Sequence, residues 1–443
     1  MNAKDYFKGK KVTLMRIGLL GRGVGDAAFL ARAGARVLVV DSAPQEAMQA
    51  SVDALTGYPE ITFKFGAYDL DDFRSCDLVL KGAGTPLTSP EIAEARAHHL
   101  PVRMSADLFV ELSGLPSVGV TGTRGKSTTT HLLYEIFERA GRTPLLGGNI
   151  RGVSTLGLLE EVSGHETAVL ELDSWQLQGF GAAGISPNIA VFTTFFPDHL
   201  NYYHGDMDAY LDDKAQIFLN QKEGDTLVLG SQVAGLVQEK YAGRIRGTVL
   251  VAGEEDLPEG WGLRLFGAHN RYNAGIAITT ARSAGIEDAA IREAVEAYGG
   301  VSGRLEFVRS VGGIAFYNDT TATTPEATVA ALQALHERHP GRIVLITGGA
   351  DKALDMTAYV RAVRDCTKHV ALLEGTGTER VLEDLHATVF TGLADAFEDA
   401  RAHASSGDAV VLSPGFASFG MFRNEYDRGD QFNALVSALP ETA

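Results

Sequence analysis

The segment GTRGKST, which begins at Gly122, combines glycines, a lysine and hydroxyl side chains in a spacing that can bind phosphate. Glycines let backbone N–H groups approach an anion, and a lysine reaches the terminal phosphates of a nucleotide. Gly122 and Gly125 would provide the close approach, Lys126 the positive charge and Ser127 a hydroxyl ligand for Mg²⁺. The common form of this loop has a glycine where Val120 stands here, so the segment is a shortened version. The alternative is an ordinary glycine turn with a solvated lysine.

Three other side chains have types and positions that suit chemistry beside a bound phosphate. Glu171 lies in an apolar run that predicts a buried strand, where a carboxylate must be paired or bind a metal ion, unless that face of the strand is exposed. His199 follows the predicted strand 188–194, and α/β sites form at the carboxyl ends of strands, although a lone histidine there is more often a surface residue. Lys214 follows in a predicted helix beside two aspartates, a pattern that by itself indicates a solvated surface lysine.

The elements that must position these residues alternate between strand and helix along the whole chain. This alternation predicts an α/β fold with mostly parallel sheets. We expect three domains, at residues 1–102, 103–302 and 303–443. The phosphate loop falls in the second domain, and the third has strands that begin near Arg342 and Asp408.

The first domain opens with a strand, a glycine-rich turn from Gly18 to Gly25, a helix, and a second strand that ends at Asp41. Such a βαβ unit predicts a Rossmann-like crevice for a ligand that carries phosphate and ribose. The glycine spacing is GxxGxGxG and not the GxGxxG of dinucleotide-binding proteins, so an NAD-dependent oxidoreductase is a weaker alternative.

Composition excludes several classes of protein. The 443 residues carry a formal net charge of −17, which gives no electrostatic footprint for nucleic acid. Cys76 and Cys366 are far apart and suggest neither a disulfide framework nor a zinc site, in keeping with a reducing cytoplasm. No signal peptide or membrane-spanning run is found at the N-terminus. We therefore expect a cytoplasmic protein that binds neither nucleic acid nor membranes.

The order of nine motifs resembles that of the Mur ligases, over nearly the whole chain. The motifs are TGTRGKSTTT, LGGNI, ELDSWQL, DHLNYYHGDMDAYLDDKAQIF, HNRYNA, GRLEFV, NDTTATTPEA, GGADK and SPGFASFGMF. The pattern is most similar to the members that add glutamate to UDP-N-acetylmuramoyl-alanine. The resemblance implies a Rossmann-like domain for the UDP-sugar, a central P-loop ATPase domain and a Rossmann-like C-terminal domain.

The resemblance also implies roles for individual residues. Lys126, Glu171, His199 and Lys214 match catalytic positions, with Ser127, Glu171, His199 and a carbamylated Lys214 as ligands of two Mg²⁺ ions. The positions that match ATP contacts are Gly122, Thr123, Arg124, Gly125, Lys126, Ser127, Thr128, Asn273, Arg304 and Asp319. Those that match contacts to the UDP-muramoyl substrate are Leu19, Leu20, Asp41, Ser42 and Asn149, and those around the incoming glutamate are Thr323, Lys352 and Ser418.

The expected activity is ATP-dependent formation of an amide between UDP-N-acetylmuramoyl-L-alanine and D-glutamate through an acyl phosphate, in peptidoglycan precursor synthesis, by a monomer. Two positions depart from the family pattern: Thr321 replaces a frequent lysine, and Glu425 replaces a common aromatic residue near the glutamate side chain. L-Glutamate or another amino acid therefore stays open as the substrate. A folylpolyglutamate synthase-like ligase is a further alternative, and a P-loop regulatory or motor protein without ligase activity is a more distant one.

Overall fold

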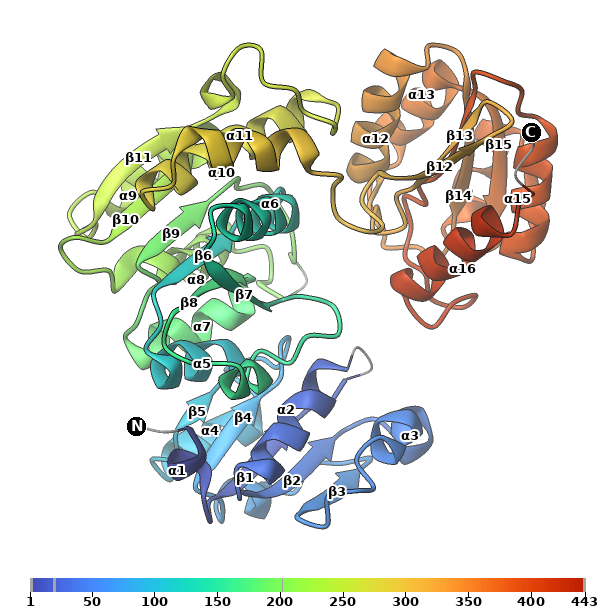
Figure 1. The fold of residues 1–443 in the computed structure, drawn as a ribbon. Coiled ribbons are helices and arrows are strands. Elements are labelled where there is room, and N and C mark those ends of the chain that lie inside the picture. The colour runs from blue at the N-terminus through green and yellow to red at the C-terminus, as the bar shows by residue number, and fades with distance from the viewer. Residues whose placement is uncertain (1–2, 19–20, 201, 441–443) are drawn as a thin grey trace. The chain divides into compact units, whose positions relative to one another are not determined.

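The computed structural model describes residues 3–18, 21–200 and 202–440 (Figure 1). Three β-sheets follow one another along the chain, with helices packed against them. The described residues form two compact units. One unit comprises Met1–Trp261 and Tyr272–Val295 and contains the first two sheets. The other comprises Gly262–Arg271 and Glu296–Ala443 and contains the third sheet.

The first sheet has five parallel strands in the order β3-β2-β1-β4-β5. Its elements are α1 (Ala3–Phe7), β1 (Lys11–Met15), α2 (Arg22–Arg32), β2 (Arg36–Asp41), α3 (Gln45–Asp53), β3 (Ile61–Phe65), a 3₁₀ turn (Leu70–Phe73), β4 (Leu78–Lys81), α4 (Pro90–Ala97) and β5 (Val102–Arg103). The strand order reverses between the neighbours β1 and β4. Ligand sites of α/β sheets form at such a reversal, outside the carboxyl ends of the strands.

The second sheet has six parallel strands in the order β11-β10-β9-β6-β8-β7. Its strands are β6 (Ser117–Thr121), β7 (Thr143–Gly148), β8 (Glu166–Glu171), β9 (Ile189–Phe192), β10 (Thr226–Gly230) and β11 (Thr248–Ala252). The helices of this part are α5 (Ser105–Ser113), α6 (Lys126–Arg139), α7 (Ser174–Ala183), α8 (Met207–Leu219), α9 (Ser231–Tyr241), α10 (Ala268–Ser283) and α11 (Asp288–Ala297), with 3₁₀ turns at Gly157–Glu160 and Glu254–Asp256. Because β6 lies between β8 and β9, the ends of these three strands form one continuous edge.

The third sheet has the order β12-β13-β17-β14-β15-β16, with β12 antiparallel to β13 and the other pairs parallel. Its strands are β12 (Glu306–Val311), β13 (Ile314–Asn318), β14 (Ile343–Gly348), β15 (Thr367–Leu373), β16 (Thr388–Phe390) and β17 (Ala409–Leu412). Its helices are α12 (Pro325–Arg338), α13 (Thr357–Cys366), α14 (Leu382–Leu385), α15 (Leu393–Ala402) and α16 (Glu425–Ser437), with a 3₁₀ turn at Thr378–Arg380.

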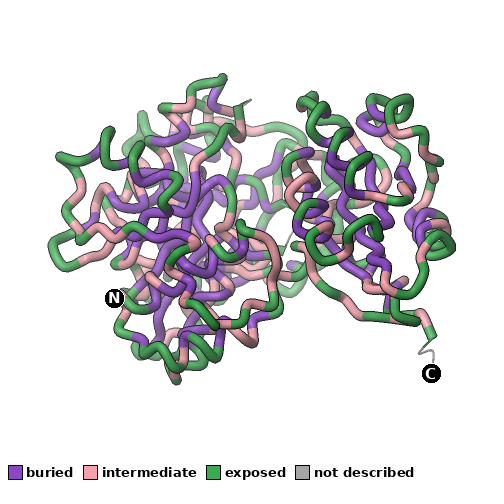
Figure 2. Tube along the Cα trace, turned by 90° about the horizontal axis from the view of Figure 1, so that it is seen from above, coloured by how far each residue is buried: buried purple, intermediate pink, exposed green. Residues whose placement is uncertain are grey.

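The central strands of these sheets are buried on both faces, and exposure is concentrated in the outer helices and loops (Figure 2). In β14, Ile343 and Leu345 pack in the cluster that includes α12 and α13, whereas Val344 and Ile346 pack in the cluster with α15 and α16. Alternate residues of a strand face opposite sides of its sheet, so a strand covered on both sides reads as an unbroken apolar run. This is why the run RIVLITGG predicts a strand.

The α/β fold with parallel sheets is confirmed, and so are the strands predicted to lead into the phosphate loop, Glu171 and His199. The domain divisions at 102/103 and 302/303 stay predictions. Cys76 and Cys366 are free and buried. None of the helices in the described part of the chain has the length and apolar character needed to cross a bilayer.

Candidate active site

The predicted phosphate loop connects the end of β6 to the start of α6. Gly125, directly before Lys126, has a φ of 86°, and Gly122 has a φ of 147°, both in the region that favours glycine. A Cβ on Gly122 would lie 2.0 Å from Thr193 Oγ1, and one on Gly125 would lie 2.3 Å from Asn273 Oδ1. The first turn of α6 directs backbone N–H groups and the positive end of the helix dipole towards the loop, so this loop is suited to hold an anion.

Two threonines that follow β9 fix the shape of the loop. Thr193 Oγ1 donates to the Arg124 carbonyl at 2.6 Å, and the Arg124 N–H donates to Thr194 Oγ1 at 2.9 Å. The Thr123 N–H donates to the Thr194 carbonyl at 2.7 Å. Lys126 Nζ donates to the carbonyls of Gly122 at 2.9 Å and Thr123 at 3.3 Å, which holds its charge over the loop.

The remaining loop residues differ in exposure. Thr123 and Ser127 are buried, Thr128 is half-buried, and Arg124 is exposed. The Arg124 guanidinium lies 3.9 Å from the carboxylate of Asp198, the residue before His199. The structure therefore brings the loop and the His199 segment together.

Glu171 ends β8 beside the phosphate-loop strand, where it pairs with Val120 of β6 and Gly148 of β7. Its side chain is buried, so the alternative of an exposed strand face is wrong. Glu171 Oε1 accepts a weak hydrogen bond from Asn149 Nδ2 at 3.5 Å. Glu171 Oε2 is buried with no hydrogen-bonding partner among the described residues, an arrangement that costs free energy unless a cation binds there.

His199 lies in the segment after β9 and has a left-handed backbone with a φ of 53°. Its ring packs on Trp175, with the ring centroids 4.6 Å apart, and its centroid lies 6.0 Å from that of Tyr210. Burial lowers the pKa of His199, the charges of Lys214 and Lys126 lower it further, and Asp198 opposes the shift. The imidazole is thereby favoured in the neutral form, which is the form that binds a metal ion.

Lys214 lies on the buried face of α8, and the interpretation as a solvated surface lysine is wrong. Sequence neighbours mislead here because Asp212 and Asp213 project from other faces of the helix, while Lys214 points towards β6. Lys214 Nζ donates to the Gly122 carbonyl at 3.0 Å and lies 4.7 Å from the centroid of the Tyr210 ring. Burial, followed by the charge of Lys126, lowers the pKa of Lys214 well below its usual value, against the opposing charges of nearby aspartates.

Asn149 and Asn273 lie on two sides of this edge. The Asn149 N–H donates to the Glu171 carbonyl at 2.7 Å, and its side-chain oxygen accepts a hydrogen bond from Arg22 Nη1. Asn273, in α10, is buried against Gly125. Around the carboxyl ends of β6, β8 and β9, the structure thus brings together the loop, Glu171, His199, Lys214, Asn149 and Asn273.

A cavity of about 340 Å³ opens at the carboxyl ends of β1 and β4, where the order of the first sheet reverses. Of the residues predicted to contact the UDP-muramoyl substrate, Asp41 lines this cavity. Ser42 is exposed and is not among the lining residues. Leu19 and Leu20 lie outside the described residues. Residues of β7 and α7 complete the wall, so the cavity reaches the second sheet.

Three cations that line this cavity were not predicted from the sequence: Arg16, Arg22 and Lys81. Lys81 ends β4, is buried, and donates from Nζ to the Thr85 carbonyl at 2.9 Å. Burial lowers the pKa of Lys81 to about 8, with Asp173 and Asp213 opposing the shift. The signal that could have found Lys81 is the one used for Glu171, a charged residue at the end of an apolar strand. Arg22 could have been found as the cation inside the glycine-rich turn.

In the other unit, Asp319 follows β13 and is buried. It accepts hydrogen bonds from the Leu305 N–H at 2.9 Å and Ser413 Oγ at 2.7 Å. Burial raises the pKa of Asp319 to about 7, although these hydrogen bonds and the charge of Arg304 oppose the shift. Arg304 itself is exposed.

Two of the residues predicted to surround glutamate are in contact, since Lys352 Nζ donates to Thr323 Oγ1 at 3.0 Å. Ser418 is buried beside Ala417, which forms a β-bridge with Ala350 in the segment that leads to Lys352. The structure therefore brings these three residues to one corner of the third sheet.

The two residues that differ from the family pattern, Thr321 and Glu425, lie in the same unit as Asp319. Thr321 donates from Oγ1 to the Gly303 carbonyl at 2.9 Å, and Glu425 begins α16. A residue that sequence reasoning missed is Arg428, which is fully buried and donates to the Thr320 carbonyl at 2.8 Å and to the Thr320 hydroxyl at 3.2 Å. Burial lowers the pKa of Arg428 to about 10. Its cation stabilises the segment that carries Asp319, Thr321 and Thr323.

Comparison with known proteins identifies the family. The Mur ligase middle domain matches residues 120–257, and the Mur ligase glutamate ligase domain matches residues 303–416, which together exceed half of the chain. The chain belongs to the Mur ligase family. A relative of this Mur ligase, the UDP-N-acetylmuramoylalanine–D-glutamate ligase of Roseiflexus sp. (strain RS-1), is 38% identical, and the match covers 97% of this chain and 99% of that protein.

Solved Mur ligases share the fold. UDP-N-acetylmuramate–alanine ligase MurC of Thermotoga maritima matches with a TM-score of 0.63 at 19% identity, covering 97% of this chain and 99% of that one. MurF ligase of Thermotoga maritima, solved in complex with ADP, matches with a TM-score of 0.59 at 16% identity, covering 99% and 97%. The predicted three-domain Mur ligase architecture is confirmed.

Proposed function

We propose that this Mur ligase uses ATP to join D-glutamate to UDP-N-acetylmuramoyl-L-alanine, releasing ADP and phosphate, in the synthesis of peptidoglycan precursors. The observation that carries the proposal is the edge of the second sheet. A loop suited to bind phosphate, a buried carboxylate with an oxygen that has no partner in the described part of the chain, and a buried lysine amine meet there. The relative of that name, similar over its full length, supports the choice of substrates.

The proposed chemistry follows from the difficulty of acylating an amine with a carboxylate. The substrate carboxylate attacks the γ-phosphorus of ATP, an O–P bond forms, and the bond to ADP breaks. The amine of glutamate then attacks the acyl carbon, phosphate leaves, and the nitrogen loses a proton as the amide forms. In both steps Lys126 neutralises charge on the phosphoryl oxygens, and the loop N–H groups orient them.

The chain's own residues fit Mg²⁺, because the buried Glu171 Oε2 has no hydrogen-bonding partner within the described residues and carboxylate oxygens are preferred Mg²⁺ ligands. We infer that Glu171, His199, the Ser127 hydroxyl and a carbamate formed on Lys214 would hold two Mg²⁺ ions. When bound, Mg²⁺ supplies positive charge to the phosphates of ATP. Asp319 and Arg304 are proposed to contact ATP from the C-terminal domain, and Asn273 to contact it beside Gly125.

Lys214 is proposed to be carbamylated. A neutral amine attacks CO₂, an N–C bond forms, and loss of a proton leaves an anionic carbamate. Burial of Lys214 next to a second lysine favours the neutral amine over the ammonium form, which is the requirement for this reaction. A carbamate would also place an anion near the Lys126 cation, where it could serve as a ligand of Mg²⁺.

The UDP-sugar is proposed to bind the cavity of the first sheet, with Asp41 towards the ribose and Arg22 and Lys81 towards the diphosphate. This assignment favours a UDP-muramoyl substrate over a folate, since a folate has no diphosphate for these cations to bind. The corresponding proposed domains are residues 1–102 for the UDP-sugar, 103–302 for ATP and 303–443 for glutamate and ATP. Asn149, between cavity and loop, is suited to hold the muramoyl-alanine portion.

Thr323, Lys352 and Ser418 are proposed to bind glutamate. Lys352 offers the cation that a carboxylate requires. Glu425 is the observation that favours a second candidate, the same ligase acting on another amino acid, because an acid beside the amino-acid side chain repels a carboxylate.

One experiment tests the activity and the choice of amino acid. Phosphate release is measured with UDP-N-acetylmuramoyl-L-alanine and a panel of amino acids that includes both enantiomers of glutamate. We expect release that depends on both substrates and is fastest with D-glutamate. Equal release without the UDP-sugar would refute the ligase, and a preference for a different amino acid would select the second candidate.

A further inference from the structure

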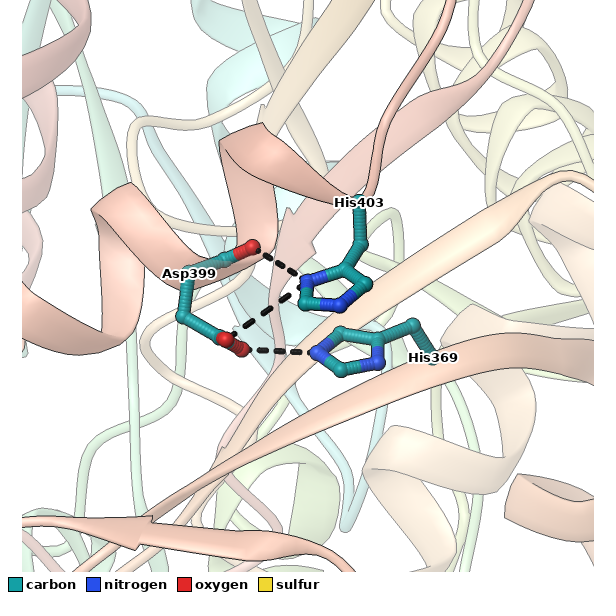
Figure 3. Close-up of side chains that lie close together, drawn as sticks. All are labelled: His369, Asp399 and His403. Atoms are coloured by element: carbon teal, nitrogen blue, oxygen red, sulfur yellow. Dashed lines mark hydrogen bonds and ion pairs between the residues drawn. The ribbon is translucent and has the colours of Figure 1, made fainter.

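His369, Asp399 and His403 form a cluster in the unit that contains the third sheet (Figure 3). His369 Nε2 lies 2.7 Å from Asp399 Oδ2, and His403 Nδ1 lies 3.5 Å from Asp399 Oδ1 and 2.8 Å from the Asp399 carbonyl. The two imidazole rings are stacked, with centroids 3.7 Å apart and planes inclined by 11°. One potential ligand atom from each of the three residues lies within 4.8 Å of the others.

The cluster is separate from the residues of the proposed ligase reaction. His369 lies near the amino end of β15, and His403 follows the last residue of α15. Asp319 and Ser413 follow β13 and β17 at the carboxyl ends of the strands of the same sheet. The proposed reaction therefore leaves the cluster without a role.

We propose that His369, Asp399 and His403 bind one divalent transition-metal ion of the zinc class. A tetrahedral site with metal–ligand bonds of about 2.0–2.1 Å separates its ligand atoms by about 3.3 Å. The two observed nitrogen–oxygen separations, 2.7 and 3.5 Å, lie on either side of this value. To form the site, the two rings must tilt out of their stack, because the lone pair of each ring nitrogen lies in the plane of its ring, and His403 Nδ1 must give up its hydrogen bond to the Asp399 carbonyl.

The donors also select the ion. Two imidazoles and one carboxylate suit Zn²⁺, Ni²⁺ or Cu²⁺, whereas Mg²⁺ prefers oxygen ligands and water. The ion would replace the hydrogen between His369 Nε2 and Asp399, and that ring would carry its proton on Nδ1. A fourth position would hold water.

The site can be tested by counting bound metal. The full-length protein is dialysed against a chelator and divided into two portions. One portion is equilibrated with Zn²⁺ and analysed for bound zinc, and the other is loaded with Co²⁺ for visible absorption. We expect His369→Ala and His403→Ala each to bind one equivalent fewer Zn²⁺ per chain than the wild type, and to lose an intense tetrahedral Co²⁺ band.

His386→Ala serves as the matched control, because His386 is an exposed histidine of the same unit outside the cluster. It should bind zinc like the wild type, and circular dichroism of the metal-free proteins checks that every variant folds. Zinc held by Glu171 and His199 would be present in all of these proteins and would cancel in the comparison. Equal zinc content and equal cobalt spectra in the wild type and the cluster variants would overturn the proposal, whether or not the ligase reaction is correct.

Discussion

Lys81 and Lys214 are both buried, and the amino group of each donates to a backbone carbonyl of a loop that follows a strand of a parallel sheet. Lys81 binds the Thr85 carbonyl at 2.9 Å, and Lys214 binds the Gly122 carbonyl at 3.0 Å. Their surroundings differ. At Lys81 the charges of two aspartates oppose the effect of burial, those of Arg16 and Arg96 add to it, and the pKa is about 8. At Lys214 the charge of Lys126 has the largest effect on the pKa after burial and adds to it, whereas nearby aspartates oppose it.

Burial is the main cause of the lowered pKa of both lysines, and neighbouring charges modify its effect. With a pKa near 8, Lys81 keeps its proton at neutral pH and can bind an anion. Lys214 is favoured as a neutral amine, which is a nucleophile. At Lys214 the charge of Lys126 adds to the effect of burial and further favours the neutral, reactive amine.

The largest expected effect is that of removing Lys126. Lys126→Ala should lower turnover by at least about 10²–10³-fold, because one charge aimed at a developing phosphoryl anion is lost from a buried site. The affinity for UDP-N-acetylmuramoyl-alanine, measured by calorimetry, should stay unchanged. Lys8→Ala, which alters an exposed lysine, is the control. Turnover within about tenfold of the wild type would mean that the phosphoryl group is bound elsewhere.

Lys214→Ala should lower turnover by about 100-fold, because it removes the proposed carbamate and its metal-binding oxygens. Acetate in the assay should restore part of this loss, since a small carboxylate can occupy the vacated position. Lys214→Arg keeps the positive charge but forms no carbamate, so it should be inactive and should not respond to acetate. Near-normal turnover of Lys214→Ala in both CO₂-depleted and CO₂-replete buffer would exclude the carbamate.

Asp319 extends the comparison to a buried charge of the opposite sign. Its pKa is about 7 in the folded protein and near 3.8 when unfolded, so the folded state holds the proton more tightly between these values. Stability should therefore fall as the pH rises from about 4 to about 7, by about 2 kcal/mol between pH 5 and pH 7. Denaturant unfolding of the wild type and Asp319→Asn would measure this, and the variant should lack the decline. Parallel pH profiles would contradict the assignment.

The smallest effect is expected at Lys81. Lys81→Met should weaken binding of UDP-N-acetylmuramoyl-alanine by about tenfold, the size of one charge-assisted hydrogen bond, with little change in kcat. Wild-type affinity should decline as the pH rises through about 8, where Lys81 loses its proton, and the affinity of the variant should not. Titration calorimetry at pH 7 and pH 9 distinguishes these outcomes. Unchanged affinity in Lys81→Met would remove Lys81 from the binding site.

Features set by neighbouring residues could be predicted from the sequence, and features set by packing could not. The phosphate loop and its helix are local, and an apolar run marks the strand that holds Glu171 in the core. The orientation of Lys214 depends on which face of α8 packs towards β6, and a short segment of sequence does not contain this information. The family resemblance supplied it instead. Lys81 was missed although it carries the same local signal as Glu171.

The hydrogen bonds from Arg22 to Asn149 and from Asn149 to Glu171 connect the UDP-sugar cavity to the edge that is proposed to bind metal and nucleotide. A diphosphate that attracts Arg22 competes with Asn149 for the same guanidinium. Release of Asn149 would change the surroundings of Glu171, so a coupling free energy would connect the two binding equilibria. If the UDP-sugar changes the affinity for the metal–nucleotide complex by some factor, thermodynamic reciprocity requires that this complex changes the affinity for the UDP-sugar by the same factor. One arginine can thus couple the affinities for the two substrates, and this coupling by itself favours neither order of loading.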